Sequence, residues 1–267
     1  SASDVYKRQY PTLLRVGLAG VFAYRAEFLV WILTTTMPFV MMSLWAAVAA
    51  DNPVGRFGAR DFVAYYLATF IVRLVTSSWL VWELTMEIRQ GTLAARLLRP
   101  LHPIIAYSAE HLAAVPMRVA VVSPLVVVLA VVASDHMPFH DPLRFAVFLA
   151  SLVGAWIILF CTMLMIGALA LFVESALSAF ELWLGVHFLL SGYLVPLELL
   201  PPAVSRIAQV LPFRYSLAFP VETLVGLVDA RTALGLLGMQ WLWVAIFATA
   251  AGTVWRLGMR RFVAFGG

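Results

Sequence analysis

The chain has 267 residues, of which 63% are hydrophobic and only 12% are charged. A soluble domain has about 45–50% apolar and about 25% charged residues, so this chain has too few charges to cover a surface that faces water. The composition excludes a disordered chain, a disulfide scaffold and a cytosolic enzyme, and it indicates a protein that crosses a membrane several times. The net charge of +4 comes from arginines between apolar runs, which is typical of topology signals and not of a nucleic-acid surface.

The start of the chain differs from the rest. Residues 1–9 (SASDVYKRQ) resemble a translated sequencing-adapter tail, so we interpret them as non-native and exclude them from fold reasoning. Residues 10–24 carry leucines near one helical face and are too short and mixed to span, which predicts an interfacial helix. We find no internal repeat and expect residues 10–267 to form a single transmembrane domain.

Hydropathy predicts an all-α membrane protein with six transmembrane helices, each near the ~20 apolar residues that a bilayer core requires. The predicted spans cover residues 28–50, 62–82, 113–133, 145–172, 180–195 and 236–257. Short cytoplasmic loops of membrane proteins carry an excess of arginine, and most arginines of the short connections lie on the cytoplasmic side when the N-terminus is placed there. Both termini are therefore predicted to be cytoplasmic.

Motifs of soluble enzymes are missing from the sequence. It has no GxxxxGK[ST] phosphate loop, no HExxH and no GxSxG elbow. His187 and Ser191 stand four residues apart, which favours ordinary packing over a catalytic pair. The loop around His136 and His140 contains Pro138, so we interpret it as a solvated loop and predict no metal site. An intramembrane enzyme and a stand-alone ion-coupled carrier remain as alternatives.

The connection between the second and third spans is long, charged and helical in period. Gly91 interrupts it, and about two turns of amphipathic helix follow before Pro100 ends them. This helix either docks a soluble partner or lies on anionic headgroups with its arginines as anchors. The candidate coupling residues are Glu87, Arg89, Gly91, Leu93, Arg96, Leu97, Arg99 and Pro100.

The segment between the fifth and sixth spans contains several prolines that forbid one continuous helix. Pro202 opens a helix of about two and a half turns, with Val204, Ile207, Ala208 and Leu211 on one face. Short re-entrant helices that form an outer gate are favoured over a plain extracytoplasmic cap. The candidate gate residues are Pro196, Pro201, Arg206, Pro212 and Phe213.

Arg73 lies near the middle of the second span, where an ionised side chain costs about 2.5–3.5 kcal/mol on insertion scales. Glu174 and Glu181 are candidate partners, whereas Glu83 is too far along its own helix. We favour a buried pair between helices over a polar translocation path.

The chain resembles the permease subunits of type-2 ABC exporters, in particular a bacterial branch of unassigned substrate. The resemblance covers the chain from residue 10 onward, and its strength lies in the order and spacing of short fragments. These are Tyr24-Arg25, Trp45, the stretch from Glu87 to Pro100, Ser191-Gly192, Pro196-Leu197, Pro201, Leu211-Pro212-Phe213, Pro220, Gly226, Gln240, Trp243 and Gly266-Gly267.

The resemblance implies a coupling helix in the inner connection, seated on a separate ABC ATPase subunit, and re-entrant helices at the outer face. It also implies a second permease chain, either identical or related, and a bacterial plasma membrane location. ATP and Mg would be bound by the partner ATPase, so this chain is expected to bind no cofactor and to catalyse no reaction itself. Membrane lipid is the remaining expected partner.

Overall fold

A computed structural model of the chain describes residues 11, 36–133, 141–173 and 175–262. Their regular structure is helical, apart from an antiparallel bridge between Val54 and Phe57, so the predicted all-α fold is confirmed. The longer helices are α3 (Met37–Val48), α4 (Ala59–Thr76), α5 (Leu80–Arg89), α7 (Pro103–Ala113), α8 (Val115–Val132), α9 (Pro142–Ala168), α10 (Ala176–Leu190) and α14 (Ala230–Met259). The shorter ones are α6 (Leu93–Leu97), η2 (Leu169–Leu171), η3 (Leu197–Leu199), α11 (Pro202–Val210), α12 (Pro212–Ser216) and α13 (Ala218–Leu224).

Among the described residues, four helical stretches are long and apolar enough to cross a membrane. They are Ala59–Arg89, Pro103–Val132, Pro142–Leu171 and Ala230–Met259, which contain or largely contain the predicted second, third, fourth and sixth spans. The apolar helices α3 and α10 are shorter, with 12 and 15 residues, and fall in or near the predicted first and fifth spans. The total of six spans therefore stays a prediction. The predicted interfacial helix and the first part of span one lie outside the described residues, except for Pro11.

The predicted second span is interrupted between α4 and α5. α5 continues beyond residue 82, into the region that was expected to be a polar connection. α4 ends at Thr76, and Ser77 is extended, with φ −61° and ψ 147°. The hydroxyl of Ser77 donates to the carbonyl of Leu74, which competes with the helical backbone pattern. α5 then forms because Leu80 and Leu84 are fully buried against a core that includes residues of α9. Sequence periodicity did not show this break.

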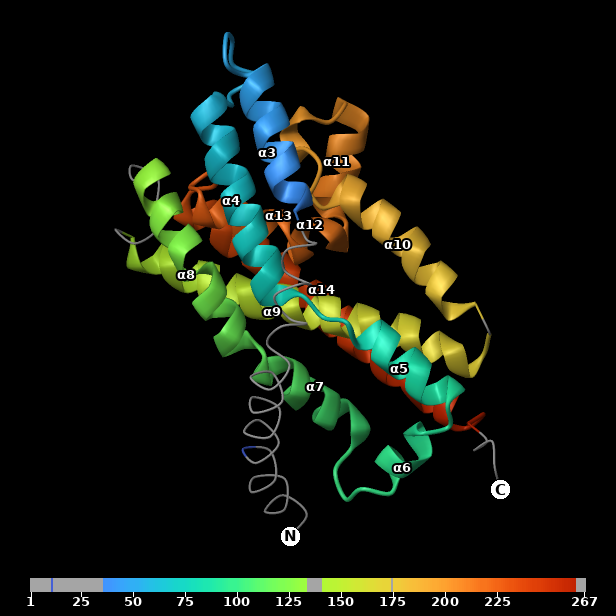
Figure 1. Cartoon of the computed structure of the whole chain (residues 1–267). Helices are drawn as coiled ribbons and strands as arrows, with labels where there is room; N and C mark the ends of the chain where they lie inside the picture. Colours follow the sequence, from blue (N-terminus) through green and yellow to red (C-terminus); the bar gives the residue numbers. More distant parts are fainter. Residues whose placement is uncertain (1–10, 12–35, 134–140, 174, 263–267) are drawn as a thin grey trace.

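α9 forms the centre of the packing, because α14, α5, α10, α12 and α13 all contact it. Figure 1 shows α14 running beside α9, with α5, α6 and α7 at one end and α11 to α13 towards the other. Gly154 allows the close approach of α14, since a Cβ at this position would lie 2.7 Å from the side chain of Gln240. The Gln240 amide donates to the carbonyls of Ser151 and Tyr215, and so joins α9, α12 and α14.

The segment between α10 and α14 is folded into short helices, as its prolines predicted. Pro202 and Pro212 each stand at the first position of a helix, where the missing N–H costs no hydrogen bond. The buried face of α11 agrees with the predicted apolar face only in part. Ala208 and Ser205 are buried, whereas Ile207 is 60% exposed. Ala208 belongs to the predicted apolar face, whereas Ile207 of the same face is exposed, because in a membrane protein an apolar side chain can face lipid.

Candidate functional site

The inner connection is compact around a very short helix. α6 has only five residues, fewer than the predicted two turns, because Leu98 caps it and Arg99 precedes a proline. Gly91 has φ +73°, a backbone conformation that favours glycine, and it turns the chain between α5 and α6. Leu93 is fully buried, whereas Leu98 is 88% exposed. The loop therefore has a well-packed base and an apolar tip.

Arg96 is the centre of the polar contacts in this loop. Its guanidinium lies 2.7 Å from a carboxylate oxygen of Glu87, 2.8 Å from Glu110 and 3.2 Å from Glu83. Arg96 thus joins α6 to both α5 and α7, and its side chain is 13% exposed. The arginine faces inward onto these three carboxylates, which we call the Arg96 cluster, and not outward onto a partner surface.

Tyr107 supports the Arg96 cluster from α7. Its ring lies under the Arg96 guanidinium at 4.2 Å, and its hydroxyl donates to Glu87. Burial alone would disfavour the charged form of Arg96, but hydrogen bonds to Glu87 and Glu110 outweigh it and raise the pKa of Arg96. Arg96 therefore carries its positive charge permanently, and the cluster holds this charge in a fixed position.

A second set of polar side chains extends from the Arg96 cluster to the break between α4 and α5. His111, which is 1% exposed, lies 3.4 Å from Glu83 and 3.5 Å from the hydroxyl of Ser78. The fully buried Arg118 of α8 donates to the carbonyl of Ser77 at 2.6 Å. Arg118 also stacks on Trp79 at 4.8 Å. Polar contacts therefore run from the inner loop to the interrupted backbone of the second span.

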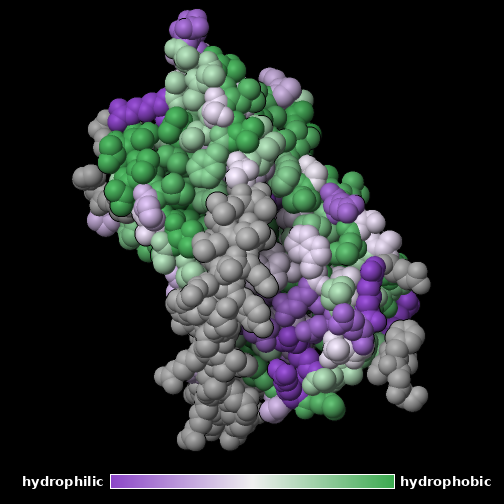
Figure 2. All heavy atoms as spheres, viewed as in Figure 1, coloured by the Kyte–Doolittle hydropathy of each residue, from purple (hydrophilic) through white to green (hydrophobic). Residues whose placement is uncertain are grey.

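The other predicted coupling residues surround this arrangement. Arg89 and Arg99 are exposed, as are Leu97 and Pro100. Figure 2 shows hydrophilic side chains gathered over the end formed by α5, α6 and α7, while most of the remaining coloured surface in this view is hydrophobic. The exposed tip of the loop is thus an apolar and basic surface at a polar end of the molecule.

The short helices η3, α11, α12 and α13 and the turn before them, which we call the outer helices after their predicted location, are held in place by side chains of the long helices. Tyr65 donates to the carbonyl of Gly192 at 2.7 Å, and Tyr66 donates to that of Leu194, also at 2.7 Å. Gln240 and Trp243 of α14 hold the other side, through the carbonyls of Tyr215 and Val210. These bonds satisfy backbone carbonyls that short broken helices leave unpaired.

The predicted gate residues are distributed over this outer segment. Pro196 is buried, Pro201 and Arg206 are exposed, and Pro212 and Phe213 are intermediate. Phe213 contacts the ring of His187 with centroids 6.2 Å apart. Arg214 next to it forms an ion pair of 2.7 Å with Glu222, in which both side chains are largely buried.

Among the described residues, Arg73 is partnered by aromatic side chains. It donates to the hydroxyl of Tyr193 and lies over the rings of Tyr193 and Phe188 at 4.6 and 5.5 Å. The candidate partner Glu181 is exposed and is not paired with Arg73, and Glu83, which was judged too far away, belongs to the Arg96 cluster. Glu174 lies outside the described residues. Arg73 therefore joins α4 to the turn that follows α10.

The pair of His187 and Ser191 shows no geometry of a catalytic dyad among the described residues. His187 stacks on Trp183, and neither its Nδ1 nor the hydroxyl of Ser191 has a hydrogen-bond partner. The described residues contain no group of side chains suited to a metal ion. The histidines at positions 136 and 140 lie outside the described residues.

Sequence reasoning missed Arg118 and the structural roles of Glu110 and Tyr107. The argument that singled out Arg73, a charge within an apolar run, applies equally to Arg118 and would have found it. No local pattern links Glu110 to Arg96, because the two residues are 14 positions apart and meet only when the loop folds back.

The comparison with protein families agrees with this architecture, whereas the comparison with curated proteins finds no match. The model described as ABC-2 family transporter protein matches residues 29–266. This range includes the inner loop, the Arg96 cluster and the outer helices, and it covers well over half of the chain. The chain therefore belongs to the ABC-2 transporter family and is a multi-pass membrane protein.

Proposed function

We propose that the chain is the permease subunit of an ATP-driven exporter and that its inner loop transmits movement from a separate ABC ATPase. The observation that supports this most is the construction of the loop. An exposed apolar tip at Leu97 and Leu98 stands on a base fixed by the Arg96 cluster. A tip that is rigidly connected to two helices can pass on a displacement, whereas a flexible loop would absorb it.

In this proposal the permease performs no covalent chemistry. ATP and Mg bind the ATPase partner, and closure of the ATPase moves the loop. A second permease chain, identical or related, completes the translocation path, and the outer helices form its extracytoplasmic gate. The transporter alternates between two conformations. ATP drives the change because it binds one of these conformations more tightly than the other and so shifts the equilibrium between them. The proposed location is the bacterial plasma membrane, with both termini cytoplasmic.

Leu98→Asp is expected to lower ATPase binding and substrate-stimulated ATP hydrolysis about tenfold or more, because it places a charge where an apolar side chain would be buried by the partner. Co-purification with the ATPase and hydrolysis in proteoliposomes measure both effects. Ala95→Ser, at an exposed position of α6 that is not among the candidate coupling residues, is the control and should retain both. Normal ATPase binding and hydrolysis in Leu98→Asp would contradict docking through this tip.

The orientation is tested by single cysteines in a Cys161→Ala background, because Cys161 is the only cysteine of the chain. A cysteine at the exposed position Asn52 should react with an impermeant maleimide in intact cells, whereas one at the exposed position Thr92 should react only after the cells are opened. Labelling of position 92 in sealed cells would reverse the proposed topology.

A further inference from the structure

A cavity of about 530 Å³ lies at the end of the molecule where α4 begins and α8 ends. Its walls combine charged side chains with an apolar surface. Arg60 and Asp61 come from the first turn of α4, Val132 from the end of α8, and Val225 and Leu227 from the segment after α13. The cavity is separate from the Arg96 cluster and from the predicted gate residues.

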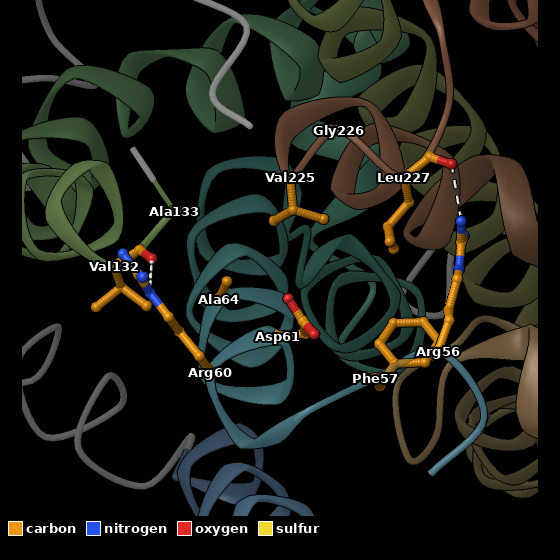
Figure 3. Close-up of a pocket in the computed structure, with 10 residues that line it drawn as sticks. All are labelled: Arg56, Phe57, Arg60, Asp61, Ala64, Val132, Ala133, Val225, Gly226 and Leu227. Atoms are coloured by element: carbon orange, nitrogen blue, oxygen red, sulfur yellow. Dashed lines mark hydrogen bonds between the residues drawn. The ribbon is translucent and has the colours of Figure 1, made fainter. Parts of the chain in front are cut away.

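Figure 3 shows how the charges are arranged around this cavity. Arg60 reaches Val132 on one side, Arg56 reaches Leu227 on the other, and Asp61 lies between them. Arg56 is also paired with Glu198, which neutralises its charge. Asp61 accepts from the backbone N–H of Gly58, which engages one of its oxygens.

Of the two arginines that line the cavity, Arg60 is the one without a carboxylate partner among the described residues. Its Nε donates to the carbonyl of Val132 at 2.6 Å and its Nη2 to that of Val131 at 3.4 Å, both at the C-terminal end of α8. These bonds hold the guanidinium at the cavity wall, while its Nη1 donates to none of the described residues. A fixed guanidinium with an unused donor is suited to bind a phosphate oxygen.

The surface next to the cavity indicates what the rest of the ligand is. Val127, Val128 and Val131 are exposed along α8, and Val131 reaches 70% exposure. This apolar strip ends at Val132, which lines the cavity itself. A ligand with its phosphate at Arg60 can therefore extend an acyl chain along α8, where lipid is the expected neighbour of exposed valines.

We propose that this cavity binds the phosphate headgroup of a phospholipid from the adjacent leaflet, with Arg60 as the principal phosphate ligand. The site goes beyond the proposed coupling to an ATPase and does not depend on it, because none of the residues that line it belongs to the Arg96 cluster or to the inner loop. A soluble phosphate ester has the same headgroup chemistry but lacks the acyl chain that the valine strip would contact.

The test is native mass spectrometry of the purified full chain titrated with dioleoyl phosphatidylglycerol. Arg60→Gln should weaken binding of the first lipid about tenfold, because one charge-assisted contact is lost. Arg60→Lys should retain most of the binding, since a point charge remains. Arg206→Gln removes an exposed arginine of α11 and is the matched control, with unchanged binding expected. Thermal unfolding of each variant checks that the fold persists.

Two further probes separate the possible ligands. Dioleoylglycerol, which lacks the phosphate, should not compete with the phospholipid for this site. Glycerol 3-phosphate should displace it only at far higher concentration. Equal binding to wild type and Arg60→Gln would overturn the proposal, as would an equal loss in Arg206→Gln. Displacement by glycerol 3-phosphate at concentrations similar to that of the lipid would overturn the assignment to a phospholipid.

Discussion

Arg96→Gln is expected to lower the free energy of unfolding of the inner loop by about 3 kcal/mol or more. Removing one partner of a largely buried ion pair leaves uncompensated charge, and here Glu83, Glu87 and Glu110 would face one another without the cation. Hydrogen exchange of the amides in α5, α6 and α7 measures the effect, together with thermal unfolding in detergent. We expect faster exchange in all three helices, because Arg96 connects them.

Two further variants separate this mechanism from a general effect of removing an arginine. Arg99→Gln changes an exposed arginine of the same loop and should leave exchange unchanged. Adding Glu110→Gln to Arg96→Gln should restore part of the stability, because it removes one of the carboxylates that repel one another. Unchanged exchange in Arg96→Gln would show that the cluster does not stabilise the loop.

Gly192→Ala should destabilise the outer segment by about 2–4 kcal/mol, through backbone strain and overpacking together. Gly192 has φ +82°, which an L side chain rarely adopts. An added Cβ would lie 2.5 Å from the hydroxyl of Tyr65 and 3.0 Å from the Cβ of Ala218, and both neighbours are buried. The Tyr65 hydroxyl donates to Gly192 itself, so it cannot move away without losing that bond.

Gly185→Ala provides the control for this prediction. Gly185 lies inside α10, and an added Cβ would meet nothing within 4 Å. The substitution should leave stability unchanged or raise it by up to about 1 kcal/mol, because alanine favours the helix. Thermal unfolding of the two variants in the same detergent gives the comparison. Similar melting temperatures for both would contradict the structural account of Gly192.

Most of the helical architecture could be predicted from the sequence, because apolar runs of membrane-spanning length have few other stable solutions. The prolines at positions 202 and 212 likewise identified short helices in the outer segment. The break at Ser77 could not be predicted in this way, because hydropathy averages over a window and does not detect three non-helical residues between two apolar helices.

The candidate site was predicted less completely than the fold. Glu87 and Arg96 were both named as candidate coupling residues, but their pairing with each other was not foreseen. Arg73 was expected to pair with a carboxylate, and its contact with Tyr193 was not foreseen, because a hydroxyl and a ring give no signal in an analysis of charge. Contacts of this kind depend on how helices pack, and one-dimensional patterns describe only the face that a helix presents.

The contact between Arg118 and Ser77 also has a consequence for how the protein is made. The carbonyl acceptor and the guanidinium donor are 41 residues apart, and the acceptor is synthesised first. When α4 and α5 reach the membrane alone, the interrupted backbone has no donor for this carbonyl and an unpaired peptide group in hydrocarbon is costly. Arg118 is equally unfavourable in lipid on its own. Biosynthesis is therefore expected to retain the second span in the insertion machinery until α8 has emerged, so that the two enter the bilayer as a hairpin.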